Sequence, residues 1–148
     1  MSGYQKILVC VDLSEGSDRV FTAARDLAAH SQGSILALHV VEFVPIEPTG
    51  ESLMSAMQME TVLVENARQR LGDFIARHKS HRPDAPNVSS RVEMGSTKSE
   101  ILRVAAEERA DLIVIGTRER HGLAILVNYT EDTVLHAAPC DVLAVRLS

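Results

Sequence analysis

Five short apolar runs alternate along the chain with segments of helical periodicity. Four of the runs are almost continuously apolar, which is typical of strands buried on both faces of a parallel sheet. The run at 88–94 alternates between apolar and polar residues and is therefore expected at an exposed edge. The runs are KILVCV (6–11), SILALHVV (34–41), VSSRVEM (88–94), DLIVIG (111–116) and CDVLAV (140–145).

The segments between these runs carry apolar residues at the spacing of amphipathic helices. A capping box of Thr97 and Glu100 is predicted to start the third helix, and Pro139 to follow the end of the fourth. Residues 42–61 are predicted to be irregular, with methionines that pack against the core or a partner, or else form a flap over a ligand. The apolar stripes are Val20, Ala23, Ala24, Leu27 and Ala28; Val64, Ala67, Leu71, Phe74, Ile75 and His78; Ile101, Leu102, Ala105 and Ala106; and Thr133, Val134 and Ala137.

This alternation predicts an α/β fold with a parallel sheet and right-handed crossovers. A chain of 148 residues lies in the common single-domain range, so one domain is expected over 1–148. With no Trp and three Phe, the core must consist mainly of Val, Ile, Leu and Ala.

Composition and charge narrow the range of possible functions. The net charge of −5 gives no support for binding nucleic acid or an anionic membrane. The first apolar run is too short for a signal segment or a membrane span, so a cytoplasmic protein is expected. Cys10 and Cys140 are expected to be reduced and buried, because neither has the spacing of a metal site or a catalytic thiol.

Asp12 is the first candidate functional residue. Ligands of open parallel α/β sheets bind beyond the carboxyl ends of the strands, where the strand order reverses, and Asp12 follows the first strand there. It is interpreted as a helix cap or as a ligand contact; Ser14 and Ser17 are candidate N-caps beside it. A phosphoacceptor, as in response-regulator receivers, is rejected because the third strand ends Glu93-Met94-Gly95 and the fifth lacks the required Lys.

The stretch GTRERHGLAILVNYTED (116–132) is the second candidate. Gly116 ends the fourth strand, where a glycine lets a ring or a phosphate approach the backbone. The following loop leads into a helix, whose N-terminal N–H groups attract anions. Glu119, however, places a carboxylate where the anion would sit. Arg118, Arg120 and His121 add positive charge to the same loop.

Taken together, these segments resemble the universal stress protein family over essentially the whole chain. That family has a five-stranded parallel sheet of order 3-2-1-4-5 with helices on both faces, a Rossmann-like fold related to the adenine nucleotide alpha hydrolases. The matching segments are KILVCVDLSEGS, ALHVVE, VEMGSTKSEIL, ADLIVIGTR and HAAPCDVLAVR.

The resemblance implies a homodimer formed by antiparallel pairing of the last strands. An apolar edge strand without Pro, and with a charge only at its end, needs such a cover. The residues expected in this contact are Val142, Leu143, Ala144 and Val145.

One branch of the family binds ATP through the pattern G-x-x-G, nine residues, G-[ST]. Here Gly116 matches the first glycine, but Glu119 stands at the second. The third glycine position falls on Tyr129 when counted forward from Glu119, and on Asn128 when counted back from Pro139-Cys140. Neither residue is a glycine, so the part of the site that would hold the phosphates is degenerate. Val41 is expected against the base. The candidate nucleotide contacts are Asp12, Leu13, Val41, Gly116, Thr117, Arg118, Gly122, Asn128, Tyr129 and Thr130.

Two functions follow from these observations. The first is a dimeric stress-response protein that acts mainly through protein interaction, with a degenerate nucleotide site and no obligatory ligand. The alternative is a switch that binds ATP or AMP, with weak ATP hydrolysis. No enzyme is predicted, because the spacing of Asp12, Ser14 and His121 defines no catalytic triad. His39 is expected to be a packed core histidine, and no metal site is predicted.

Overall fold

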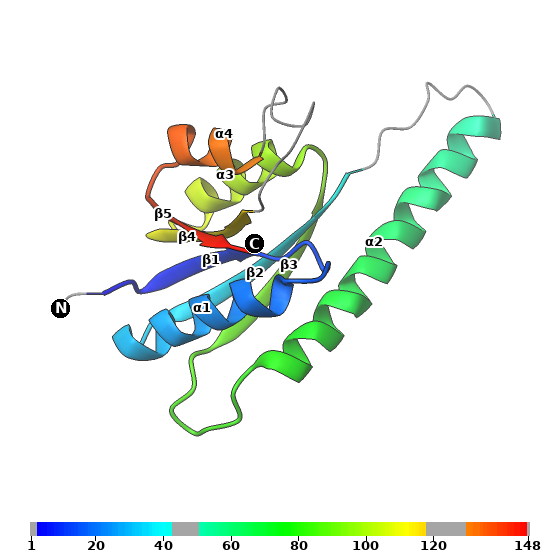
Figure 1. Ribbon diagram of the computed structural model, residues 1–148. Helices are drawn as coiled ribbons and strands as arrows, with labels where there is room; N and C mark the ends of the chain where they lie inside the picture. Colours follow the sequence, from blue (N-terminus) through cyan, green and yellow to red (C-terminus); the bar gives the residue numbers. More distant parts are fainter. Residues whose placement is uncertain (1–2, 43–50, 118–129, 148) are drawn as a thin grey trace.

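A computed structural model describes residues 3–42, 51–117 and 130–147. The chain forms a five-stranded parallel sheet of order β3-β2-β1-β4-β5, which confirms the predicted fold class (Figure 1). Each strand lies within one residue of its predicted bounds. The elements are β1 (Lys6–Cys10), α1 (Ser17–Ser31), β2 (Ser34–Val41), α2 (Glu51–His78), β3 (Val88–Met94), α3 (Thr97–Glu107), β4 (Leu112–Thr117), α4 (Thr130–Ala137) and β5 (Asp141–Arg146).

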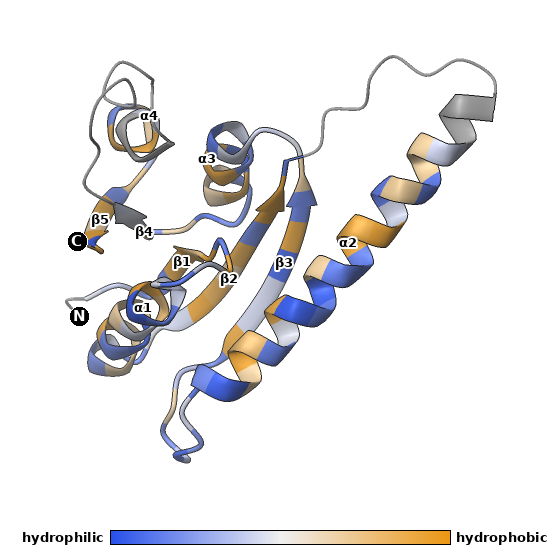
Figure 2. Cartoon of the chain, turned by 45° about the vertical axis from the view of Figure 1, so that its right-hand side comes forward, coloured by the Kyte–Doolittle hydropathy of each residue, from blue (hydrophilic) through white to orange (hydrophobic). Residues whose placement is uncertain are grey.

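The core has two layers, one on each face of the sheet. Side chains at alternate positions of β1 point to opposite faces. Ile7 and Val9 pack with α1 and α2, and Leu8 packs with α3 and α4. Figure 2 shows the strands β1 and β2 as largely hydrophobic. Strands buried on both faces explain the continuous apolar runs in the sequence.

The two edge strands of the sheet differ in their pattern of apolar and polar residues. β3 alternates and lies at an edge, as predicted. β5 has an apolar run typical of a strand buried on both faces, but it lies at the other edge, with Leu143 and Ala144 exposed. Leu143 and Ala144 are therefore not covered within the described chain, whereas Val142 and Val145 pack against the core.

Helix α2 begins earlier than the sequence analysis predicted. It starts at Glu51, so residues 51–61 are helical rather than irregular. Its first half extends beyond the sheet (Figures 1 and 2), and Met57, Met59 and Val62 are exposed there. Only the second half packs on the sheet, through Ala67, Leu71, Phe74 and Ile75. Met57 and Met59 are thus not core residues.

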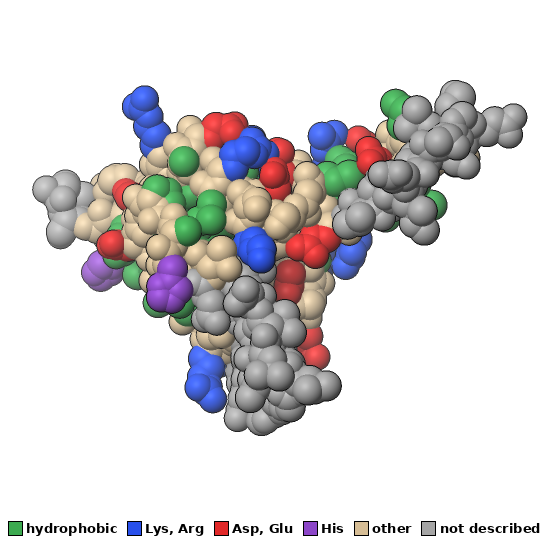
Figure 3. Space-filling model, turned by 90° about the horizontal axis from the view of Figure 1, so that it is seen from above, with side chains coloured by type: hydrophobic (Ala, Val, Ile, Leu, Met, Phe, Trp, Pro, Cys, Tyr) green, Lys and Arg blue, Asp and Glu red, His purple; other side chains and the backbone are tan. Residues whose placement is uncertain are grey.

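Charged residues on β3 and α3 form a network of ion pairs. Arg103 contacts Glu93, Glu100 and Glu107, and Arg91 contacts Glu93 and Glu107. On the face seen in Figure 3, basic side chains of the described residues are scattered, several of them beside acidic ones, and form no large basic surface. Among the described helices, none combines the length and the apolarity that crossing a bilayer requires.

Candidate ligand-binding site

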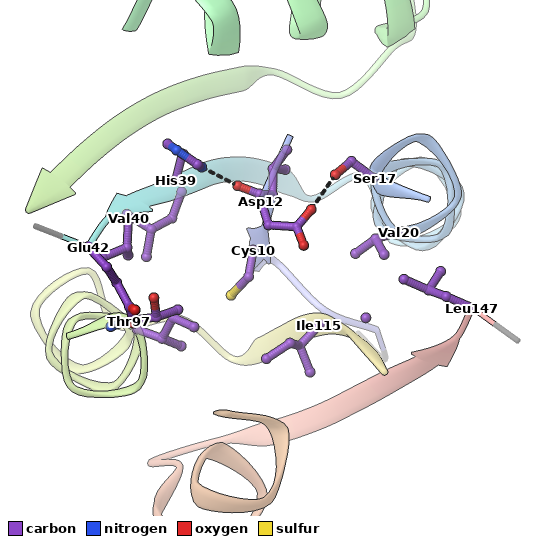
Figure 4. A pocket seen from close by; sticks show the side chains of 14 residues that line it. Cys10, Asp12, Ser17, Val20, His39, Val40, Glu42, Thr97, Ile115 and Leu147 are labelled. Carbon is purple, nitrogen blue, oxygen red and sulfur yellow. Dashed lines mark hydrogen bonds between the residues drawn. The ribbon is translucent and has the colours of Figure 1, made fainter. Parts of the chain in front are cut away.

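A pocket lies beyond the carboxyl ends of β1, β2 and β4, beside the first turns of α1 and α3 (Figure 4). Its volume is 360 Å³, toward the lower end of the roughly 300–1,000 Å³ typical of small-molecule sites. β1 and β4 are neighbours in the sheet, so the pocket lies at the reversal of strand order, as predicted. The described lining residues are Cys10, Val11, Asp12, Ser17, Val20, Leu38, His39, Val40, Glu42, Thr97, Ile101, Ile115, Gly116 and Leu147.

Asp12 is held by the turn between β1 and α1. Its Oδ1 accepts hydrogen bonds from the backbone N–H of Ser14 (3.0 Å), the Ser14 hydroxyl (2.6 Å) and the Ser17 hydroxyl (2.8 Å). The prediction that the two serines are N-caps was wrong. Gly16, with φ 101°, occupies the N-cap position without a side-chain cap, so Ser17 already lies inside the helix. The serines instead orient the Asp12 carboxylate at the pocket.

Glu42 joins the end of β2 to the start of α3. Its Oε1 accepts the backbone N–H of Thr97 at 3.0 Å. The predicted capping box does not form, because the N-cap is Ser96, without a side-chain cap, and Glu100 pairs with Arg103. Hydrogen bonding from Thr97, through its side chain and then its backbone N–H, holds the pKa of the Glu42 carboxyl below its ordinary value.

We expect Glu42→Ala to lower the free energy of unfolding by about 1 kcal/mol at pH 7, the size of a lost helix cap. A carboxyl with a depressed pKa in the folded state stabilises the protein above its unfolded pKa of about 4.3 and loses this effect as the pH falls. The difference between variant and wild type should therefore shrink below about pH 4. Urea unfolding at several pH values measures it.

The control for this experiment is Glu65→Ala, which removes an exposed carboxylate paired with Arg68 on α2. It should change stability by less than about 0.5 kcal/mol. If Glu42→Ala lowered the free energy of unfolding equally at neutral and acidic pH, this result would contradict a role for the ionised carboxylate.

His39 and Cys10 are lining residues that sequence reasoning did not assign to the site. His39, predicted as a packed core histidine, is half-buried, and its Nδ1 lies 2.7 Å from the Val11 carbonyl oxygen. This contact links Val11, the residue after β1, to β2. Both cysteines are free, as expected, but each is half-buried rather than buried. Burial raises the pKa of the Cys10 thiol to about 12, which keeps it neutral at physiological pH.

Gly116 has a packing role that the sequence did not reveal. A Cβ at this position would lie 2.7 Å from Cδ1 of Leu147 and 3.0 Å from Cγ2 of Val20. The space above the glycine is therefore filled by the protein's own side chains. The backbone N–H of Leu147 also donates to the Thr117 carbonyl at 2.8 Å, which fixes the residue after β5 over the end of β4.

The structure brings two of the predicted contacts, Asp12 and Gly116, into the pocket. Leu13 and Thr117 are not part of the lining; Leu13, with φ 64°, packs against the core. Val41, expected against the base, is not part of the lining either. Strand alternation places Val40 in the lining, whereas Val41 is absent from it.

The remaining predicted contacts lie largely outside the described residues. These are Arg118, Gly122, Asn128 and Tyr129, together with Glu119, Arg120 and His121 from the same stretch. Thr130 is the first residue of α4. Within the described ranges, no group of three His, Cys, Asp or Glu side chains is suited to a metal ion.

Comparison with known proteins agrees with this architecture. The universal stress protein family model matches residues 3–146. Universal stress protein A homolog 2 of Coxiella burnetii is 33% identical, over 99% of this chain and 98% of the relative. The structure of UspA from Lactobacillus plantarum superposes with a TM-score of 0.71 at 28% identity, covering 99% of this chain and all of the other. A universal stress protein in complex with cAMP, at 21% identity and a TM-score of 0.67 over 99% of this chain and all of that one, shares the fold.

Proposed function

This chain belongs to the universal stress protein family, and we propose that it is a homodimeric, cytoplasmic stress-response module that acts through protein contacts without catalysis. Its pocket accepts the adenosine part of a ligand, whereas its phosphate side is degenerate. The observation that carries this proposal is the pocket at the reversal of strand order, where apolar walls surround the oriented carboxylate of Asp12.

The edge strand β5 supports a homodimer. Its apolar side chains include Leu143, which is 37% exposed, and its described charged residues are confined to its two ends. Exposed apolar edges of this kind pair with another strand unless something blocks them. Antiparallel pairing of two β5 strands would cover Val142, Leu143, Ala144 and Val145 in both copies.

We expect Leu143→Lys to convert the dimer into a monomer, because a lysine on an edge strand opposes pairing. Size-exclusion chromatography with light scattering gives the mass directly. Val62→Lys is the matched control. Val62 is 52% exposed on α2, the helix that contacts β3, and β3 is the edge strand opposite to β5. It should leave the dimer intact. A dimeric Leu143→Lys variant would contradict pairing through β5.

Ligand binding is tested by denaturing the purified protein and identifying any released nucleoside or nucleotide by chromatography. Titration calorimetry with adenosine, AMP and ATP then measures affinity in ligand-free protein. Binding of at least one of these compounds supports the proposed pocket. If the protein releases no such ligand and binds none of the three, the pocket has no adenosine-binding role.

The second candidate function is a nucleotide-dependent switch that binds ATP or AMP, with weak ATP hydrolysis. The relative that was crystallised with cAMP favours this alternative, because its ligand carries a phosphate. The switch requires ATP or AMP to bind at least as tightly as adenosine. Release of phosphate from ATP by the purified protein would further distinguish this switch from the proposed module that acts without catalysis.

A further inference from the structure

We propose that the pocket selects an uncharged nucleoside over the corresponding nucleotides, and that Leu147 and Glu42 determine this selectivity. The inference rests on the proposed function, since it presumes that the pocket binds an adenosine-like ligand. Both residues line the pocket and approach it from different sides, Leu147 beside Val20 of α1 and Glu42 beside Thr97 of α3 (Figure 4).

Leu147 covers the side of Gly116 on which a Cβ would stand. A glycine at a strand end serves phosphate binding when its backbone is open to the ligand. Here a Cβ on Gly116 would lie 2.7 Å from the Leu147 side chain, so a ligand atom on that side of the glycine would have to displace Leu147. The hydrogen bond from the Leu147 N–H to the Thr117 carbonyl, 2.8 Å long, holds this cover in place.

Glu42 occupies the start of α3. Helix N-termini attract phosphate because their first N–H groups lack partners within the helix. In this protein the N–H of Thr97 already donates to the Glu42 carboxylate at 3.0 Å. The chain therefore places its own anion where the phosphate of a ligand would gain most from α3.

The remaining chemistry of the described lining residues favours a neutral ligand. Two carboxylates, those of Asp12 and Glu42, belong to the lining, and neither Lys nor Arg occurs among the described lining residues. A phosphate would face like charges there. A nucleoside instead offers an aromatic ring to apolar residues such as Leu38 and Val40, and offers hydroxyl and amino donors to the carboxylates. The volume of 360 Å³ also suits a nucleoside better than a triphosphate.

The test is titration calorimetry of the full chain with adenosine, AMP and ATP. Wild type should bind adenosine at least roughly tenfold more tightly than ATP, with AMP between them. Leu147→Ala should uncover Gly116, and Glu42→Gln should remove one negative charge while keeping an oxygen that accepts the Thr97 N–H. Each substitution should narrow the difference between adenosine and ATP by roughly three- to tenfold.

Two matched controls separate selectivity from general effects. Leu135→Ala removes an exposed leucine on α4 that is not part of the lining, and Glu65→Gln removes a charge on α2. Both should keep the wild-type ratio of adenosine to ATP affinity. Because Leu147 also packs against the core, a thermal melt checks that its variant folds. Glu42→Gln provides an independent measurement if that variant does not.

The outcomes distinguish this inference from the proposed function. Wild-type protein that binds ATP as tightly as adenosine overturns the inference and leaves the pocket as a ligand site. An affinity ratio unchanged in both Leu147→Ala and Glu42→Gln overturns the role of these two residues. Protein that binds none of the three compounds overturns the proposed ligand site and the inference with it.

Discussion

Replacing Phe21 by alanine should lower the free energy of unfolding by about 3–5 kcal/mol. Phe21 is fully buried in α1 and meets Phe74 of α2 edge-to-face, with ring centroids 5.6 Å apart and planes at 85°. The substitution removes the largest fully buried side chain and leaves a cavity between two helices and the sheet. A domain is stable by only about 5–15 kcal/mol, so the loss should be plain in urea unfolding.

A double-mutant cycle isolates the aromatic contact within this loss. Phe21→Leu, Phe74→Leu and the double variant keep most of the apolar volume, and their coupling energy should be about 0.5–1.5 kcal/mol. Leu135→Ala, at an exposed position of α4, is the control and should change stability by less than about 0.5 kcal/mol. A cost below about 1 kcal/mol for Phe21→Ala would contradict the packing described.

The sheet could be predicted because its strands carry a dense local signal. Strands such as β1 and β4 are apolar on both faces, and their bounds differ from prediction by at most one residue. The place of the pocket followed from strand order, since Asp12 and Gly116 lie at the carboxyl ends of neighbouring strands. The strands were predicted from local patterns of a few residues, whereas the full strand order was an expectation from the resemblance to the universal stress protein family.

Helix α2 shows where that local signal fails. Periodicity reveals a helix through the face that it buries, and the buried residues of α2 begin at Ala67. The first half extends beyond the sheet with Met57 and Val62 exposed, and its apolar residues at helical spacing, such as Leu53 and Ala56, were interpreted as part of an irregular segment. A start at Glu51 could also have been inferred from Gly50, after which no Gly or Pro interrupts the chain until Gly72.

The details of the pocket depend on contacts between residues far apart in sequence. Leu147 lies over Gly116, and Glu42 meets Thr97, although no motif relates either pair. A capping box at Thr97 was a sound local expectation, but a carboxylate from another strand takes its place. The family pattern describes glycines as open backbone, and the structure identifies the side chain that covers this one.

Substitution of Asp12 should have the largest effect on ligand binding. We expect Asp12→Ala to weaken adenosine binding roughly ten- to a hundredfold, because a hydrogen bond to a charged group contributes about 1.5–3 kcal/mol. The same variant removes the acceptor of the buried Ser17 hydroxyl and should cost about 1–3 kcal/mol of stability. Calorimetry measures the first effect and urea unfolding the second.

Asp12→Asn separates these two roles of the carboxylate. The amide keeps one oxygen in the position of Oδ1, where it can still accept hydrogen bonds from Ser14 and Ser17. Stability should therefore stay close to that of wild type, while adenosine binding falls because the charged acceptor is lost. Asp26→Ala, on the exposed side of α1, should change neither property. Undiminished adenosine binding by Asp12→Ala would remove Asp12 from the site and leave it only the task of holding the turn before α1.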